Sequence, residues 1–222
     1  MRATRHPSFF DLNTVRVEDS PTIGAEALAA FADQALSGLE HRKLDFDHAA
    51  AGRPLRAKFE AMGWKVTRLI WMHHERALPP GPAISVETVP YDTVDALRVA
   101  WHQEDFPGLD PADYLASVRA VALSCGVKVL AVRAGDTPVA FGEVERFGGA
   151  AEITSVYVHP QHRGQGLGTA VTCAAVEVAS DAEDVWIVAD DEDRAKDLYA
   201  RLGFRPAWVT MEFLRLPPAG AS

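Results

Sequence analysis

Hydrophobic and polar positions over residues 83–216 follow two alternating periods, one near 2 residues and one near 3.6. Alternating or short apolar runs predict strands at residues 83–89, 127–134, 138–147, 151–158, 184–188 and 204–216. Apolar residues three and four positions apart predict helices at residues 92–106, 111–123, 167–179 and 194–202. The order β-α-α-β-β-β-α-β-α-β predicts an α/β (α+β) fold, in which the strands at 127–134, 138–147 and 151–158 form an antiparallel meander.

A glycine-rich segment joins the strand at 151–158 to the helix at 167–179, with the sequence Arg163-Gly-Gln-Gly-Leu-Gly168. Alternate glycines let the backbone turn sharply and approach a ligand without Cβ atoms in the way. Free N–H groups at the helix start favour negative charge, and Arg163 adds a positive charge. The spacing matches neither the P-loop nor the dinucleotide pattern. We predict a phosphate site, the alternative being a turn that only reverses the chain.

This segment resembles the acetyl-CoA pyrophosphate loop of the GNAT superfamily of N-acetyltransferases, whose signature is Arg/Gln-x-x-Gly-x-Gly/Ala. Arg163, Gly166 and Gly168 occupy the signature positions. The run Leu198-Tyr-x-x-Leu-Gly-Phe204 resembles a second element of that family, and the family's fold has the predicted order of elements. The resemblance therefore implies the GNAT fold, with a mixed, mostly antiparallel, twisted sheet flanked by helices. The resemblance implies acetyl-CoA as cosubstrate and no metal, with binding by Val156, Tyr157, Val158, Arg163, Gly164, Gln165, Gly166, Leu167, Gly168 and Thr169.

The resemblance also implies the chemistry, which is direct attack of a primary amine on the thioester. Backbone N–H groups near Tyr157 and Val158 would polarise the carbonyl. Tyr199 is the candidate general acid for the departing thiolate, because a phenol is protonated at neutral pH; an aromatic core position is the alternative. Glu152 and Glu143, on adjacent strands, are candidates to accept the amine's proton, although each also fits a plain solvent-facing position, and water alone is a further alternative.

The acceptor pocket of GNAT proteins commonly includes the segment between the first two helices. Trp101, Glu104 and Phe106 lie there, and an aromatic ring beside carboxylates suits an ammonium group. A buried tryptophan at a polar helix end explains the same residues. His73 and His74 are neighbours in a predicted strand and point to opposite faces, so they do not share a metal ion.

A proline-rich segment at 79–82 has the composition of a linker. We therefore expect three parts: residues 1–78, the linker at 79–82 and a catalytic GNAT domain at 83–216. Gly63 and Gly203 are 140 residues apart and have similar neighbours, so we interpret the first part as a truncated, degenerate GNAT-like αβ unit. Chance similarity of two αβ units is the alternative.

The expected role of that first part follows from the same offset. It sets Ile23, Glu26 and Leu28 beside the signature positions of the loop, and a carboxylate and bulky side chains would exclude a pyrophosphate. One CoA site per chain is therefore expected. The first part either shapes the acceptor pocket or only stabilises the sheet.

Composition narrows the possible partners. The net charge of −9 argues against nucleic acid, and no apolar run approaches membrane length. Two cysteines without paired spacing are expected to be reduced core thiols. We expect a cytoplasmic acetyl-CoA-dependent N-acetyltransferase, monomeric or homodimeric, acting on a small-molecule or peptide amine, with no nucleic-acid or membrane partner. A non-catalytic acyl-CoA sensor or structural protein and a transferase for longer acyl-CoA remain alternatives.

Overall fold

The computed structural model describes residues 1–75 and 77–216, and these residues form two compact units. The first unit consists of Met1–Trp71, Asp190–Asp193 and the described chain from Trp208, and the second of Met72–Ala189 and Arg194–Ala207. Among the described residues, no helix has the length and apolar character that crossing a membrane requires.

The boundary between the two compact units does not lie in the proline-rich segment at 79–82, where the sequence suggests a domain boundary. Instead, the chain passes from one unit to the other inside two long strands, β3 (Lys65–His74) and β9 (Phe204–Arg215). Each of these strands contributes residues to both units. The cause at β9 is its pairing with β2 (Arg42–Phe46), which carries its last residues into the first unit. The division into residues 1–78 and 83–216 therefore stays a prediction about which segments share an origin, and it does not describe how the chain packs.

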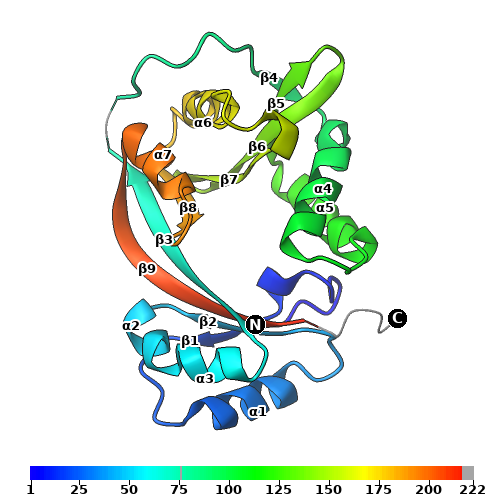
Figure 1. Ribbon diagram of the computed structural model, residues 1–222, viewed down its shortest axis with the longest axis vertical. Helices are drawn as coiled ribbons and strands as arrows, with labels where there is room; N and C mark the ends of the chain where they lie inside the picture. The colour runs from blue at the N-terminus through cyan, green and yellow to red at the C-terminus, as the bar shows by residue number, and fades with distance from the viewer. Residues whose placement is uncertain (76, 217–222) are drawn as a thin grey trace. The chain divides into compact units, whose positions relative to one another are not determined.

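The second unit has the predicted order of elements (Figure 1). They are β4 (Glu87–Val89), η3 (Tyr91–Val94), α4 (Asp95–Asp105), α5 (Ala112–Cys125), β5 (Lys128–Ala134), β6 (Thr137–Phe147), β7 (Ala150–Val158), η4 (Pro160–His162), α6 (Leu167–Val178), β8 (Asp184–Asp190) and α7 (Ala195–Arg201), followed by the start of β9. The first strand is shorter than the predicted 83–89, because only residues 87–89 pair with β5. Cys125, expected in the core, is exposed at the end of α5, whereas Cys173 is buried.

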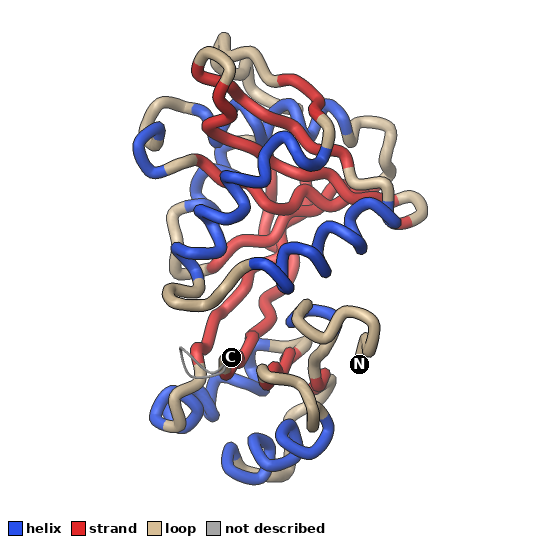
Figure 2. The backbone as a smooth tube through the Cα atoms, turned by 90° about the vertical axis from the view of Figure 1, so that its right-hand side faces the viewer, coloured by secondary structure: helices blue, strands red, loops and turns tan. Residues whose placement is uncertain are grey.

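The sheet of this unit is mixed and mostly antiparallel, as predicted. Its strand order is β3-β8-β7-β6-β5-β4. β4–β5, β5–β6 and β6–β7 pair antiparallel and β7–β8 parallel. The strands lie between helices (Figure 2). Adjacent residues of a strand point to opposite faces, so Phe141 packs with residues of α4 and α5 while Ala140 packs with Val171 of α6.

A single glycine lets α6 approach β6 closely. A Cβ atom on Gly142 would lie 2.6 Å from Cγ1 of Val171, well inside van der Waals contact. Valine is stiff at its branched Cβ, so the clash is not relieved by a rotamer change. The glycine therefore fixes the distance between the helix and the strand beneath it.

We expect Gly142→Ala to destabilise the protein by about 1–3 kcal/mol, because the added methyl group overfills this contact. The loss should be smaller when Val171→Ala is already present, since the overlapping methyl is then absent. Urea unfolding of the two single variants and the double variant measures this coupling. Gly81→Ala is the matched control, because its Cβ would meet Cys173 at an ordinary 3.6 Å. If Gly142→Ala lowers the free energy of unfolding equally with Val171 and with Ala at position 171, the packing argument is contradicted.

The first unit is a smaller αβ layer. Its elements are η1 (Phe10–Leu12), β1 (Val15–Val17), α1 (Ala25–Ala35), β2, α2 (Ala49–Gly52), η2 (Arg53–Leu55) and α3 (Arg56–Ala61), with β3 and β9. The strand order is β1-β2-β9-β3, with β1–β2 parallel and β2–β9 antiparallel.

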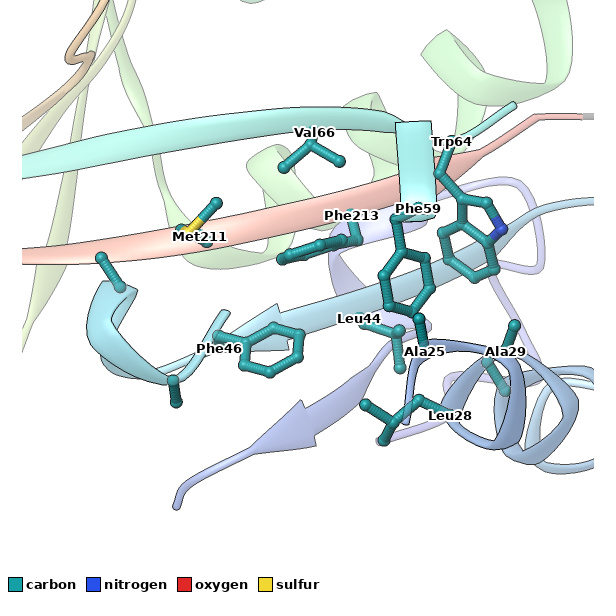
Figure 3. Close-up of a cluster of buried hydrophobic side chains, with 13 residues drawn as sticks. Ala25, Leu28, Ala29, Leu44, Phe46, Phe59, Trp64, Val66, Met211 and Phe213 are labelled. Carbon is teal, nitrogen blue, oxygen red and sulfur yellow. The ribbon is translucent and has the colours of Figure 1, made fainter. Parts of the chain in front are cut away.

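Helical spacing explains which face of α1 is buried, because its buried residues fall at positions i, i+3, i+4 and i+7. That face packs on an aromatic cluster shown in Figure 3. The ring centroids of Phe46 and Phe213 lie 4.8 Å apart, and Phe59 lies 4.8 Å from Phe213 and 5.0 Å from Trp64. The first unit therefore has a hydrophobic core of its own.

The two units share a succession of elements. The order β1-α1-β2-α3-β3 in the first matches β7-α6-β8-α7-β9 in the second, and the first strand pair is parallel in each. Gly63 and Gly203 both adopt a left-handed φ, at 80° and 98°. The N–H of each glycine donates a hydrogen bond to the carbonyl of the residue three positions earlier. These shared features support the predicted internal repeat, which itself stays a prediction.

Candidate functional site

The glycine loop has the backbone that the sequence predicts. Gly164 and Gly166 adopt φ of 76° and 81°, a left-handed region in which side chains with a Cβ are strained. Gly166 is the N-cap residue of α6, and the first turn of this helix carries no acidic side chain. The first N–H groups of an α-helix have no acceptor within the helix. The loop therefore offers backbone donors and a positive helix end to an anion.

The third glycine, Gly168, lies near α7 and the end of β7. A Cβ atom at this position would lie 3.5 Å from Cδ2 of Leu198 and 3.7 Å from Cγ2 of Val158, which are ordinary van der Waals separations. Leu198 of α7 therefore lies beside the start of α6, directly after the loop. Tyr199, the next residue of α7, is buried, and its ring lies 6.2 Å from that of Phe204.

A β-bulge interrupts β7 just before the loop. Thr154 pairs with Glu143 and Tyr157 with Phe141, so Ser155 and Val156 together stand opposite the single residue Gly142. Ser155 has φ of 56° and is the one residue other than glycine with positive φ in the described part of the chain. Sequence reasoning missed this bulge, although the spacing of three between Ile153 and Val156 breaks the alternation expected of a strand.

Strands β7 and β8 pair only over part of their length. Their parallel register runs from Ala150↔Asp184 to Ile153↔Ile187. The last residues of β7, which include Tyr157 and Val158, lie beyond this register. The register of the two strands therefore ends just before the bulge, close in sequence to the loop.

Glu104 joins the predicted acceptor segment to the loop. Its Oε1 accepts a hydrogen bond from the Tyr157 hydroxyl at 2.5 Å, and its Oε2 accepts one from Arg163 at 2.7 Å. Arg163 Nε also donates to the Val158 carbonyl at 3.0 Å. Burial would raise the pKa of Glu104, but these hydrogen bonds outweigh it and hold the pKa below its ordinary value. Burial and the bond to Glu104 raise the pKa of the Tyr157 hydroxyl.

The other two predicted acceptor residues lie in different surroundings. The Trp101 ring stacks on Tyr157 with centroids 5.9 Å apart, so it shares the neighbourhood of Glu104. Phe106 instead packs with His102 at 5.1 Å and Tyr114 at 6.4 Å. The structure thus brings Trp101 and Glu104 together on Tyr157 and turns Phe106 toward α5.

The two candidate bases differ sharply. Glu143 is 5% exposed, and its Oε1 accepts hydrogen bonds from Arg98 at 2.5 and 3.1 Å. Arg98 was not singled out from the sequence, because nothing in the local pattern links residues this far apart. Glu152 is half-buried and stands opposite Glu145 on β6 and Trp186 on β8. A buried guanidinium therefore already occupies the Glu143 carboxylate.

Four of the eight histidines form two pairs in the sequence, His73 with His74 and His159 with His162. His73 lies 3.0 Å from Asp184, whereas His74 lies 3.2 Å from the Leu202 carbonyl, and β3 ends at His74. Among the described residues no group of three or more potential metal ligands occurs. His159 and His162 flank the loop with ring centroids 6.0 Å apart. The Nδ1 of His159 is buried and has no hydrogen-bond partner among the described residues.

Comparison with known proteins agrees with this geometry. Among solved structures, a functionally unknown conserved protein from Staphylococcus epidermidis shares 18% identity, with a TM-score of 0.71, 97% of this chain and 89% of that one covered. A GCN5-related N-acetyltransferase from Sphaerobacter thermophilus shares 16%, with a TM-score of 0.56 and coverage of 86% and 67%. A tandem GNAT protein from the clavulanic acid biosynthesis pathway shares 18%, with a TM-score of 0.51 and coverage of 89% and 70%. These likenesses show the fold alone.

A family match settles the assignment. No curated protein matches the chain significantly. Residues 93–204, about half of the chain, match the family described as Acetyltransferase (GNAT) family. The matched range includes the glycine loop, the bulge and α7. The chain therefore belongs to the GNAT family of acetyltransferases, and its fold supports acyl transfer.

Proposed function

We propose that this protein transfers the acetyl group of acetyl-CoA to a primary amine by direct attack of the amine. The observation that carries the proposal is the loop with two left-handed glycines, which opens onto the N-terminus of α6 next to Arg163. A diphosphate suits this place, because backbone donors, the helix dipole and a guanidinium all favour negative charge. The first turn of α6 carries no carboxylate to oppose it.

Residues on both sides of the loop would hold the cosubstrate. Arg163 and the backbone from Gly164 to Thr169, including Gln165 and Leu167, would bind the diphosphate, and the end of β7, at Val156, Tyr157 and Val158, would bind along the acyl-bearing arm. When bound, acetyl-CoA supplies an activated thioester carbonyl. The parting of β7 and β8 leaves N–H groups of β7 outside the strand register, and donors of this kind stabilise the charge that develops on a carbonyl oxygen.

Proton transfer needs an acid and an acceptor for the amine's proton. We assign the acid to Tyr199, on the helix that packs against the start of α6. For the proton acceptor we favour Glu152 over Glu143, because the Glu143 carboxylate is buried against Arg98, and protonating it would break that ion pair. Trp101 and Glu104 would face the acceptor, and Phe106 would contribute through its packing on α5.

The deciding experiment measures thiol release from acetyl-CoA over a panel of primary amines, amino acids and peptides. Turnover with one amine class and not with the corresponding alcohols supports N-acetyl transfer. Tight CoA binding with no turnover on any amine would contradict the proposal and indicate a binding protein. Comparison of acetyl-, propionyl- and butyryl-CoA in the same assay decides between acetyl and longer donors.

Glu104 yields a further expected result. Its carboxylate binds the guanidinium that would bind the diphosphate, and it adds negative charge beside that site. We expect Glu104→Gln to tighten CoA binding about three- to tenfold, because both the competition and the repulsion decrease. Isothermal calorimetry at fixed ionic strength measures the change.

The matched control is Asp92→Asn, which removes an exposed carboxylate that is likewise paired with an arginine, Arg119, at 2.7 Å. This control should leave CoA affinity unchanged. Weaker CoA binding by Glu104→Gln would contradict the competition and show that Glu104 instead positions Arg163 for the diphosphate.

A further inference from the structure

The first unit contains a cavity on the sheet face opposite its hydrophobic core. Its volume is about 550 Å³, and its lining comes from β1, β2, β3 and β9. In these strands core residues alternate with cavity residues: Leu44 and Phe213 belong to the core, whereas Asp45 and Glu212 line the cavity. Phe46 and Met211 belong to the core and also border the cavity. Helices α1, α2 and α3 contribute to the core side. The cavity is thus formed by one unit alone.

One wall of the cavity is aromatic. Trp71 on β3 and Trp208 on β9 stack with ring centroids 5.1 Å apart and planes 13° from parallel. Trp71 donates its indole N–H to Thr210 Oγ1 at 3.2 Å, which restricts the rotation of the ring. Trp208 remains 40% exposed although it is large and apolar. An indole face is the strongest aromatic partner for a cation.

Another part of the lining is acidic. Asp45 and Glu212 are cross-strand neighbours on β2 and β9. Lys43 lies between them, 2.9 Å from Glu212 and 3.5 Å from Asp45, and it also binds Asp11. Three carboxylates therefore share one ammonium group. Asp45 Oδ1 is buried, and its 3.5 Å separation from Lys43 is longer than an ordinary hydrogen bond.

The remaining charges near the cavity do not remove this excess. Arg16 forms two hydrogen bonds with Asp47, at 2.8 and 2.9 Å, so this pair is neutral by itself. The amino group of Met1 donates to the Thr14 carbonyl at 2.7 Å, and the carboxylates still outnumber the cations when it is counted. Burial raises the pKa of Asp45 and of Glu212, although the Lys43 ammonium opposes this rise.

We propose that this cavity is a binding site for a small organic ammonium ion that carries alkyl substituents. The cation would lie against the Trp71–Trp208 pair, near Asp45 and Glu212, and its alkyl groups would contact Leu69. Charge complementarity selects this class: an anion would meet the excess carboxylates, and a neutral ligand would leave them uncompensated. The site goes beyond acetyl transfer and does not depend on it.

Choline is the probe, and 3,3-dimethylbutan-1-ol, which has the same shape without the charge, is its matched control. We expect the full-length protein to bind choline with Kd of about 1 mM or tighter, with a change in tryptophan fluorescence, and to bind the alcohol at least about tenfold more weakly. Calorimetry gives the two affinities. Equal binding of both compounds, or no binding of choline up to about 10 mM, would overturn the proposal.

Two variants locate the probe. Trp208→Ala and Glu212→Gln should each weaken choline binding about tenfold, the first by removing the exposed ring and the second by removing one charge. Phe31→Ala, which removes an exposed aromatic ring of α1 outside the cavity, should leave it unchanged. Circular dichroism checks that each variant is folded. Unchanged affinity in both cavity variants would place choline elsewhere and refute the site. Since CoA is absent from this assay, a failure here leaves the acetyltransferase proposal standing.

Discussion

Gly166→Val is expected to weaken CoA binding by at least about a hundredfold, or about 2.7 kcal/mol. Gly166 has φ of 81° at the N-cap of α6, and a β-branched residue is strongly disfavoured there. The loop would have to abandon the left-handed turn, which would redirect the N–H groups at the helix start. A side chain at this position would also stand where the backbone has to approach the diphosphate. Isothermal calorimetry with CoA measures the loss.

The matched control for this variant is Gly148→Val. Gly148 also has positive φ, at 61°, with nothing within 4 Å of its Cβ position, and it lies in the turn before β7, at the far end of that strand from the loop. Both variants carry backbone strain, but only Gly166→Val should lose CoA affinity. Normal CoA binding by folded Gly166→Val would show that the loop does not hold the nucleotide.

The elements of residues 83–216 could be predicted because their signals are local. Alternation, helical spacing, the turn at residues 135–137 and the glycine stop after α7 each lie within a few neighbouring residues. The one short strand, β4, differs because pairing with β5, rather than its own pattern, decides where it begins. Local patterns specify elements, and pairing partners specify their limits.

The sharing of β9 could not be predicted for the same reason. Its last residues pair with β2, so that Glu212 stands opposite Asp45, far away in the sequence. The residues of β9 that pair with β2 are about as apolar as those that precede them in the strand, so the sequence does not mark where this pairing begins. Composition alone places a domain boundary at the proline-rich segment. The boundary between the compact units is instead decided by which strands pair.

The same contrast holds in the candidate site. The loop was predictable, because left-handed glycines and a helix start are encoded within one short segment. The ion pair of Glu143 with Arg98 and the bridge from Glu104 to Arg163 were not, because each joins elements far apart in the chain. Sequence reasoning treated Glu104 as an acceptor residue and Arg163 as a cofactor residue; their contact links the two predicted functions.

Tyr199→Phe is expected to reduce kcat about 10²- to 10⁴-fold while CoA affinity stays within about twofold of the wild type. The ring is buried on α7 and the substitution keeps it, so folding and the packing of α7 should be preserved. What is lost is the phenolic proton that the departing thiolate requires. Thiol release with the best amine gives kcat, and calorimetry gives the CoA affinity.

A buried tyrosine in the same unit supplies the control. Tyr91 is 8% exposed, and its hydroxyl has no hydrogen-bond partner among the described residues, so Tyr91→Phe should leave kcat unchanged. The pH profile separates a proton donor from a packing residue. A phenolic acid makes kcat fall at alkaline pH as the phenol deprotonates, and Tyr199→Phe should lack this decline. A variant that keeps full kcat, or keeps the alkaline decline, would make Tyr199 a core aromatic residue and leave thiolate protonation to water or another group.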